Sequence, residues 1–149
     1  MRILLQRVSR AEVRVDGERV GAIGPGLLAL VGVGPADTEA VARSLADKVV
    51  ELRIFRDDAG LTNRSLLDTG GELLAVSQFT LYADARKGRR PSFIRVAPAA
   101  RAESLYGIFT DAVAARGIRV GRGIFGAVME VELVNDGPMT IWLDNEAGQ

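Results

Sequence analysis

The stretch LLAVSQFTLYAD, residues 73–84, combines an apolar strand pattern with polar side chains that could do chemistry. Ser77, Gln78 and Thr80 stand where a strand buried on both faces would keep apolar residues. In a regular strand, alternation turns Ser77 and Thr80 to opposite faces, so their hydroxyls cannot act on one atom. Main-chain N–H groups around Phe79 and Thr80 are the better candidates for binding one substrate oxygen, provided that the strand edge is unpaired there. Ordinary strand hydrogen bonds would account for each polar side chain taken singly.

The residue types that are missing narrow the chemistry further. The 149 residues include no His and no Cys, which excludes thiol nucleophiles, histidine bases, Cys/His zinc sites and disulfides. A Thr80 hydroxyl nucleophile stays an alternative, although the sequence offers no evident base to activate it. Asp57 and Asp58, together with Asp68, could bind a hard cation, but RDDAG is typical of a turn. We therefore expect no metal and no cofactor.

Five cations and no acid fall within residues 86–95: Arg86, Lys87, Arg89, Arg90 and Arg95. Over the whole chain, 19 Lys and Arg balance 19 Asp and Glu, so no general attraction to nucleic acid is indicated. The cluster is either a local phosphate-binding patch or a solvated loop, and the loop is the simpler interpretation.

The pattern of apolar residues predicts one α+β domain over residues 1–149, with a curved or barrel-like, mostly antiparallel sheet and two main helices. The expected strands cover 2–8, 11–15, 19–23, 24–34, 73–82 and 118–121. A hairpin turn is expected at Asp16-Gly17. One helix should cover 37–52, with Asp37 as N-cap, and the other 98–116, with Pro98 in its first position.

Two apolar sets at alternating positions end the chain: Met129, Val131 and Leu133, then Met139, Ile141 and Leu143. A three-residue loop at 135–137 would pair Leu133 with Met139 and place all six side chains on one face. We therefore predict a hairpin here, with Gly137 at the position that needs a positive φ.

No run of about 18 apolar residues predicts a membrane-spanning helix. The first residues, MRILLQRVSRAEV, are too charged for a signal peptide and are typical of a strand. We expect a cytoplasmic protein with no membrane partner.

Four segments together resemble the D-aminoacyl-tRNA deacylase family: QRVSRAEV at 6–13, SQFTLYAD at 77–84, KGRRPSF at 87–93 and NDGPMT at 135–140. Their order and spacing agree with the family over essentially the whole chain. The resemblance implies a homodimer of a compact α+β fold that hydrolyses the ester joining a D-amino acid to the terminal adenosine of tRNA. It also implies removal of glycine wrongly placed on alanine tRNA, and no DNA partner.

The same resemblance implies roles for the SQ-x-TL segment. Ser77, Gln78 and Phe79 would line the substrate pocket of one subunit. Catalysis would rest on oxyanion contacts from N–H groups near Phe79 and Thr80, with help to the attacking water from the ribose 2′-OH.

A second set of roles would belong to the other subunit. The family's Gly-Pro bond, here Gly137-Pro138, is cis and would be inserted from the partner as a chiral filter that excludes L-amino acids. Arg7, in the family's QRV motif, would lock the orientation of that filter.

Two further groups would contact the RNA. Phe125 and Met129 would lie near the terminal adenosine, although Val128 stands where the family segment is expected to carry a polar residue. The possible phosphate contacts are Arg86, Lys87, Arg89 and Arg90. Other interpretations are a module that binds tRNA ends without cleavage and a hydrolase of small D-esters that ignores RNA.

Overall fold

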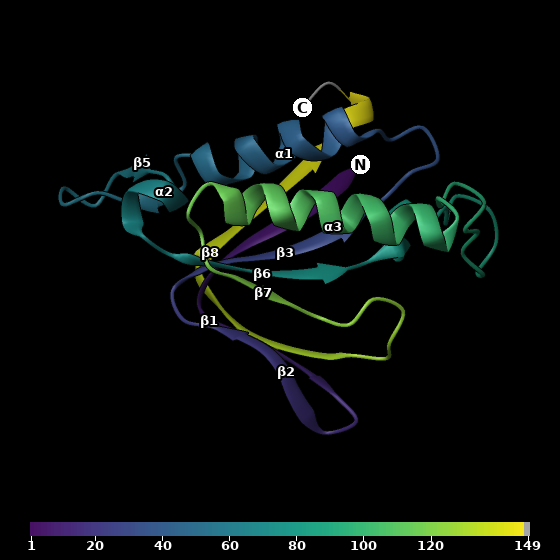
Figure 1. Ribbon diagram of the computed structural model, residues 1–149, viewed down its shortest axis with the longest axis horizontal. Helices are drawn as coiled ribbons and strands as arrows, with labels where there is room; N and C mark the ends of the chain where they lie inside the picture. Colours follow the sequence, from purple (N-terminus) through teal and green to yellow (C-terminus); the bar gives the residue numbers. More distant parts are fainter. Residues whose placement is uncertain (148–149) are drawn as a thin grey trace.

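The computed structural model describes residues 1–147, in which a strongly curved mixed sheet carries its long helices on one face (Figure 1). The strands of this sheet are β1 (Arg2–Val15), β2 (Glu18–Ile23), β3 (Gly26–Gly32), β6 (Glu72–Ser77), β7 (Val120–Arg122) and β8 (Glu130–Asp144). The helices are α1 (Glu39–Glu51), α2 (Leu66–Thr69) and α3 (Ala99–Ala115), with 3-10 turns η1 (Phe79–Tyr82) and η2 (Asn145–Ala147). A separate small hairpin joins β4 (Phe55–Arg56) to β5 (Thr62–Arg64). The predicted α+β class is confirmed.

The long strand β1 organises the sheet. It runs unbroken over the two strands predicted at 2–8 and 11–15, and it turns at Asp16-Gly17 into β2 as predicted. Its first half pairs with β3, its second half with β2, and β8 pairs with its other edge. β3 and β6 then pair in parallel, and β2 curls back towards β7, where a Cβ on Gly21 would lie 2.7 Å from the Arg122 carbonyl oxygen. The sheet is therefore nearly a closed barrel.

The predicted terminal hairpin is wrong, because β8 is a single strand along β1. Leu133 pairs with Ala11 and Ile141 pairs with Leu5, both antiparallel. The residues of the expected loop form a bulge instead, since β8 uses five steps from Asn135 to Thr140 where β1 uses two. Gly137 in this bulge has the positive φ that was predicted, 135°.

The bulge also changes which face of the sheet the apolar side chains reach. The apolar residues after it pack with the core beneath the helices: Met139, Ile141 and Leu143. Those before it pack with a second cluster on the other face: Met129, Val131 and Leu133. The prediction that all six share one face is therefore wrong, while the alternation within each set is confirmed.

The N-cap of helix α1 lies one residue later than predicted, at Thr38 instead of Asp37. The side chain of Thr38 caps it by accepting from the Val41 N–H at 3.3 Å. Asp37 is 2% exposed, and its carboxylate accepts from the Gly34 N–H at 2.7 Å and pairs with the Met1 ammonium. Asp37 does not cap the helix because its carboxylate pairs with the buried Met1 ammonium. Thr38 takes the N-cap position, since threonine caps helices almost as well as aspartate.

The helix α3 agrees closely with its predicted span. Pro98 lies at the N-cap, one position before the predicted one, and Gly117 follows the helix with φ 84°. Leu105, Phe109 and Val113 form its buried stripe. Together α1 and α3 cover one face of the sheet, and no helix among residues 1–147 is long and apolar enough to cross a membrane.

The parallel pairing of β3 with β6 requires a glycine at its start, which gives a test of the fold. A Cβ on Gly26 would lie 1.8 Å from the Glu72 carbonyl oxygen, while one on Gly24 would come no nearer than 3.5 Å to the Glu72 carboxylate. We expect Gly26→Ala to lower the melting temperature by roughly 10 °C or more, because the strands must separate. Gly24→Ala is the matched control. Equal melting temperatures for the two variants, measured by circular dichroism, would contradict this strand pairing.

Candidate active site

The strand β6 stops pairing where the polar residues of the SQFTLYAD segment begin. The Gln78 N–H donates to the Val31 carbonyl oxygen at 2.8 Å, and the chain then turns into η1. The prediction of a regular strand over 73–82 is therefore wrong. β6 ends here because its neighbouring strands end, since β7 pairs with it only as far as Ala75 and β3 ends at Gly32.

The turn η1 leaves two main-chain donors free. The first N–H groups of any helical turn lack partners within that turn. Among residues 1–147, the N–H groups of Phe79 and Thr80 have no acceptor within the protein. These donors are free because they begin a helical turn, not because they lie on an unpaired strand edge as expected. That they act together on one oxygen stays a prediction.

The side chains beside these donors offer little for nucleophilic catalysis. The exposed Thr80 hydroxyl is hydrogen-bonded to the Gln78 amide, and the chain has no histidine to activate it. The alternative cation site also lacks support. The Asp57 carboxylate accepts from the N–H groups of Ala59 and Leu61 within its turn, and these bonds hold its pKa below the usual range.

A pocket of about 400 Å³ opens beside η1, at the end of β3 and β6 and the start of α3. Five of the predicted site residues line it: Ser77, Gln78, Phe79, Phe125 and Met129. The rest of the lining is mostly apolar and comes from β3 and Val33 after it, from β6, α3 and β8, and from the segments 96–97 and 126–127. The structure therefore brings together two predicted groups that lie about fifty residues apart in the sequence.

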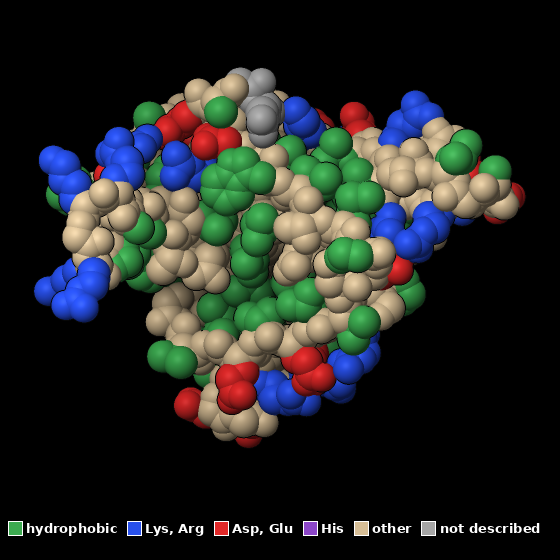
Figure 2. All heavy atoms as spheres, turned by 180° about the vertical axis from the view of Figure 1, so that it is seen from behind, with side chains coloured by type: hydrophobic (Ala, Val, Ile, Leu, Met, Phe, Trp, Pro, Cys, Tyr) green, Lys and Arg blue, Asp and Glu red, His purple; other side chains and the backbone are tan. Residues whose placement is uncertain are grey.

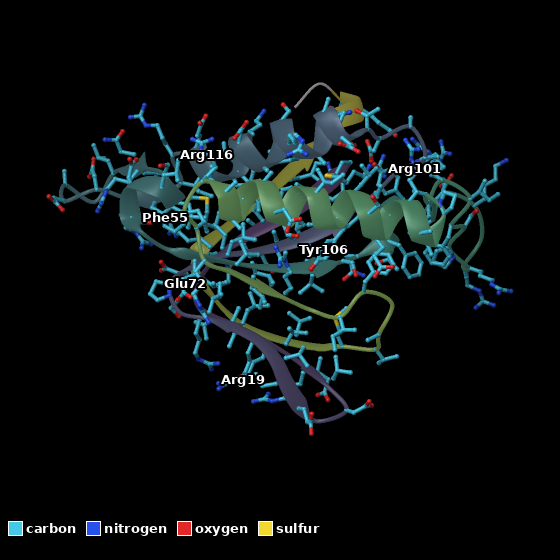
Figure 3. The ribbon with its side chains drawn as sticks, in the orientation of Figure 1. Arg19, Phe55, Glu72, Arg101, Tyr106 and Arg116 are labelled. Atoms are coloured by element: carbon cyan, nitrogen blue, oxygen red, sulfur yellow. The ribbon has the colours of Figure 1, made fainter. Side chains whose placement is uncertain are left out.

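Tyr106 is a pocket residue that the sequence did not reveal. It reaches from α3 towards the sheet (Figure 3), and its hydroxyl donates to the Ala75 carbonyl oxygen at 2.9 Å. Burial raises the pKa of this hydroxyl to about 12, so it stays a neutral donor. Its ring lies 6.2 Å from that of Phe125. Nothing in the sequence distinguishes Tyr106 from the other residues of the predicted helix.

The basic cluster lies on a loop next to the pocket. Asp84 and Ser92 exchange two main-chain hydrogen bonds, so residues 85–91 project as a loop. The Arg86 guanidinium binds the Asp84 carboxylate at 2.8 Å and holds its pKa well below the usual range. Arg95 lies beyond this loop and pairs with the Glu146 carboxylate at 2.8 Å. The other three cations of the cluster are exposed and have no acidic partner among residues 1–147: Lys87, Arg89 and Arg90.

The Gly137-Pro138 bond lies in the bulge of β8, is cis, and is exposed. Arg7, only 3% exposed, lies directly beneath it. The Arg7 Nε donates to the Asp136 carbonyl oxygen at 2.9 Å, and its Nη1 donates to the Ile54 carbonyl oxygen at 2.6 Å. A Cβ on Gly137 would lie 2.6 Å from Arg7 Nη2. The predicted contact between Arg7 and this segment is thus present within one chain.

The Asp136 carboxylate lies between two guanidinium groups. One oxygen is 3.4 Å from the buried Arg7 Nε, and the other is 3.3 Å from Nη1 of the exposed Arg56. The Asn135 amide also donates to the carbonyl oxygens of Arg7 and Met139, at 2.9 and 3.0 Å. The bulge is therefore fixed from both sides.

The bulge and the pocket lie at opposite ends of the sheet. Asn135 pairs with Val8, which is level with Gly26 and Glu72, whereas Ser77 is five residues further along β6. At the rise of a strand this separation is roughly 17 Å. Figure 3 shows the same layout, with Phe55 and Glu72 towards one end and Tyr106 nearer the other. Gly137-Pro138 therefore does not reach the pocket of its own chain.

Comparison with known proteins agrees with these features. Residues 4–144 match the family described as D-Tyr-tRNA(Tyr) deacylase. A "D-aminoacyl-tRNA deacylase" of Thermomicrobium roseum is 61% identical over 145 residues, which are 97% of this chain and 94% of that protein. A protein of the same name from Deinococcus deserti is 58% identical over 144 residues, covering 97% of this chain and 99% of its own.

One solved structure is titled "c-Myc DNA Unwinding Element Binding Protein". It superposes with a TM-score of 0.90 at 38% identity, covering 97% of this chain and 98% of that one. Because the matched residues include the sheet, the pocket and the β8 bulge, this chain belongs to the D-Tyr-tRNA(Tyr) deacylase family.

Proposed function

We propose that this protein hydrolyses the ester bond between a D-amino acid and the terminal adenosine of tRNA. The observation that carries the proposal is the pair of free N–H groups in η1 at the edge of the pocket. Family membership supports the substrate class, since the relatives carry the name D-aminoacyl-tRNA deacylase. The reaction releases free tRNA and free amino acid, and a protein that acts on tRNA would work in the cytoplasm.

The main chain of η1 is the proposed catalytic group. Water attacks the ester carbonyl carbon, and the oxyanion that forms accepts hydrogen bonds from the Phe79 and Thr80 N–H groups. The bond from carbon to the 3′-oxygen then breaks, and the ribose takes up the proton at that oxygen. The neighbouring 2′-OH positions and polarises the water, so the protein itself needs no histidine.

A second copy of the chain supplies the chiral filter. Gly137-Pro138 lies too far from its own pocket, so it enters the pocket of a partner related by two-fold symmetry. An L side chain would collide with this main chain, whereas a D side chain points away. Glycine has no side chain to collide, so glycine on alanine tRNA is hydrolysed as well.

The surface of the molecule supports association of two copies. Figure 2 shows hydrophobic side chains along a hollow on the face of the sheet turned away from the helices. Trp142 on β8 is exposed too, and it alternates with Ile141 and Leu143, which face the helices, so it lies on the face turned away from them. A contiguous apolar area of this kind marks an interaction surface.

The remaining predicted residues fit contacts with the RNA. Phe125 and Met129 line the pocket and would bind the terminal adenosine. Val128 is 92% exposed, so its difference from the family pattern leaves the lining unchanged. The phosphate contacts would be made by the exposed cations of the basic loop, Lys87, Arg89 and Arg90, more than by Arg86, which already binds Asp84.

Replacing Thr80 separates main-chain catalysis from a hydroxyl nucleophile. We expect Thr80→Val to keep single-turnover deacylation of D-tyrosyl-tRNA within about tenfold of the unchanged protein, because the N–H at this position remains. A substrate that ends in 2′-deoxyadenosine should react at least roughly a hundredfold more slowly, because it lacks the assisting hydroxyl.

Thr80→Ser is the control, since it keeps a hydroxyl. Near-complete loss in Thr80→Val with full activity in Thr80→Ser would favour the nucleophile mechanism. Full activity on the 2′-deoxy substrate would contradict assistance by the RNA. Binding without release of amino acid by the unchanged protein would instead indicate a module that only docks tRNA ends.

Chiral selection gives a prediction about the bulge. Asp136→Asn removes the negative charge placed against the buried Arg7 guanidinium, so the filter should lose its fixed position. We expect hydrolysis of L-tyrosyl-tRNA to rise at least about tenfold, while the single-turnover rate on D-tyrosyl-tRNA changes less. Arg56→Gln removes only the exposed partner of Asp136 and should alter the L-rate by less than about threefold. An unchanged L-rate in a folded Asp136→Asn protein would refute this role of the bulge.

A further inference from the structure

Two phenylalanine rings are exposed at the edge of the pocket. The side chains of Phe79 and Phe93 are 54% and 42% exposed, although rings of this size usually bury most of their surface. Their centroids lie 5.2 Å apart with the rings inclined at 71°. Since Phe79 also lines the pocket, the pair continues the pocket wall outwards to the surface.

The pair lies at the foot of the basic loop. The main-chain pairing of Asp84 with Ser92 brings both ends of the loop together directly before Phe93. Beyond that pairing the loop carries the cations without acidic partners in the described chain, Lys87, Arg89 and Arg90. Aromatic rings next to unpaired cations form the usual binding surface for single-stranded nucleic acid, because the rings stack on bases while the cations bind phosphates.

We propose that Phe93, together with Phe79, is a stacking platform for the unpaired nucleotide that precedes the terminal adenosine of the tRNA. This inference rests on the proposed function, which places the terminal adenosine in the pocket. The RNA strand then has to leave the pocket across its edge, and Phe79 forms part of that edge. The basic loop binds the phosphates on either side of the stacked base.

The platform gives the site a preference for tRNA over small esters. A free aminoacyl-adenosine fills the pocket but ends before Phe93. A single-stranded tRNA end gains one stacked base and the phosphate contacts. The protein should therefore distinguish the two substrates in KM more than in kcat, because stacking outside the pocket is the same before and during the reaction.

The test compares substrates of different length in the same variants. Phe93→Ala should raise KM for D-tyrosyl-tRNA roughly tenfold and leave kcat unchanged. It should leave both constants unchanged for D-tyrosyl-adenosine. Phe93→Trp keeps a stacking surface and should retain the KM of the unchanged protein. Ile94→Ala, which truncates the neighbouring side chain that is 91% exposed but has no ring, is the matched control and should change nothing.

A tRNA whose penultimate nucleotide lacks its base completes a double-mutant cycle between Phe93 and that base. The unchanged protein should lose about the same factor on this substrate, and Phe93→Ala should add no further loss. Equal KM for Phe93→Ala and the unchanged protein on intact D-tyrosyl-tRNA would overturn the platform. So would an equal loss on tRNA and on D-tyrosyl-adenosine, which would show that Phe93 only supports the pocket.

Binding without reaction separates this proposal from the proposed function. The dissociation constant of a single-stranded RNA ending in CCA should rise roughly tenfold in Phe93→Ala, while that of adenosine stays constant. This result would support the platform even if D-tyrosyl-tRNA were not hydrolysed at all, which would refute the proposed reaction alone. An unchanged dissociation constant for the RNA would refute the platform whatever the activity.

Discussion

The end of the β3–β6 pairing at Ser77 is the constraint on which the site depends. As far as Ser77, β6 pairs in parallel with β3. One residue later the Gln78 N–H makes the last contact with β3, and η1 begins. A turn that starts where a strand ends presents unsatisfied N–H groups while the strand behind it stays fixed. Placement of this kind suits an activated ester, which needs orientation and charge stabilisation more than a strong nucleophile.

The opposite end of the sheet is held by a buried charge beneath the β8 bulge. There a buried cation, Arg7, is held by carbonyl oxygens from two segments and by the Asp136 carboxylate. A charge in such a position has to keep its partners, so the bulge above it has little freedom. A rigid segment is what a chiral filter requires, because a filter that moved aside would admit the L-amino acid. Each chain thus carries the pocket with η1 at one end of its sheet and the proposed filter at the other. Two copies would together complete two sites.

Much of this arrangement was accessible from the sequence, for reasons that are local. Alternation in β8 and the positive φ of Gly137 are properties of a few neighbouring residues, and both were predicted. The partner of β8 was not, because alternation does not tell whether a strand pairs with itself in a hairpin or with β1. Asp37 was misassigned for a similar reason, since its buried partner, the Met1 ammonium, is 36 residues away.

Among the site residues too, those in local sequence motifs were predicted and those whose role depends on distant contacts were not. The motifs identified Ser77 to Phe79 and the pair Phe125 and Met129, and the fold brings these groups into one pocket. Tyr106 carries no such signal, because a buried tyrosine on an apolar helix face is ordinary packing until the pocket beside it is seen. The turn η1 was missed as well, since apolar residues at 79, 81 and 82 suit a strand as readily as a 3-10 turn.

A crystal structure with a stable analogue, in which an amide joins D-tyrosine to the 3′ position of adenosine, tests the central claim most directly. The account predicts the analogue's carbonyl oxygen within about 3 Å of the Phe79 and Thr80 nitrogens. It also predicts that the main chain of Gly137-Pro138 from a second copy faces the carbon that bears the tyrosine side chain. A carbonyl oxygen turned away from both nitrogens, or a pocket completed by its own chain alone, would contradict the account.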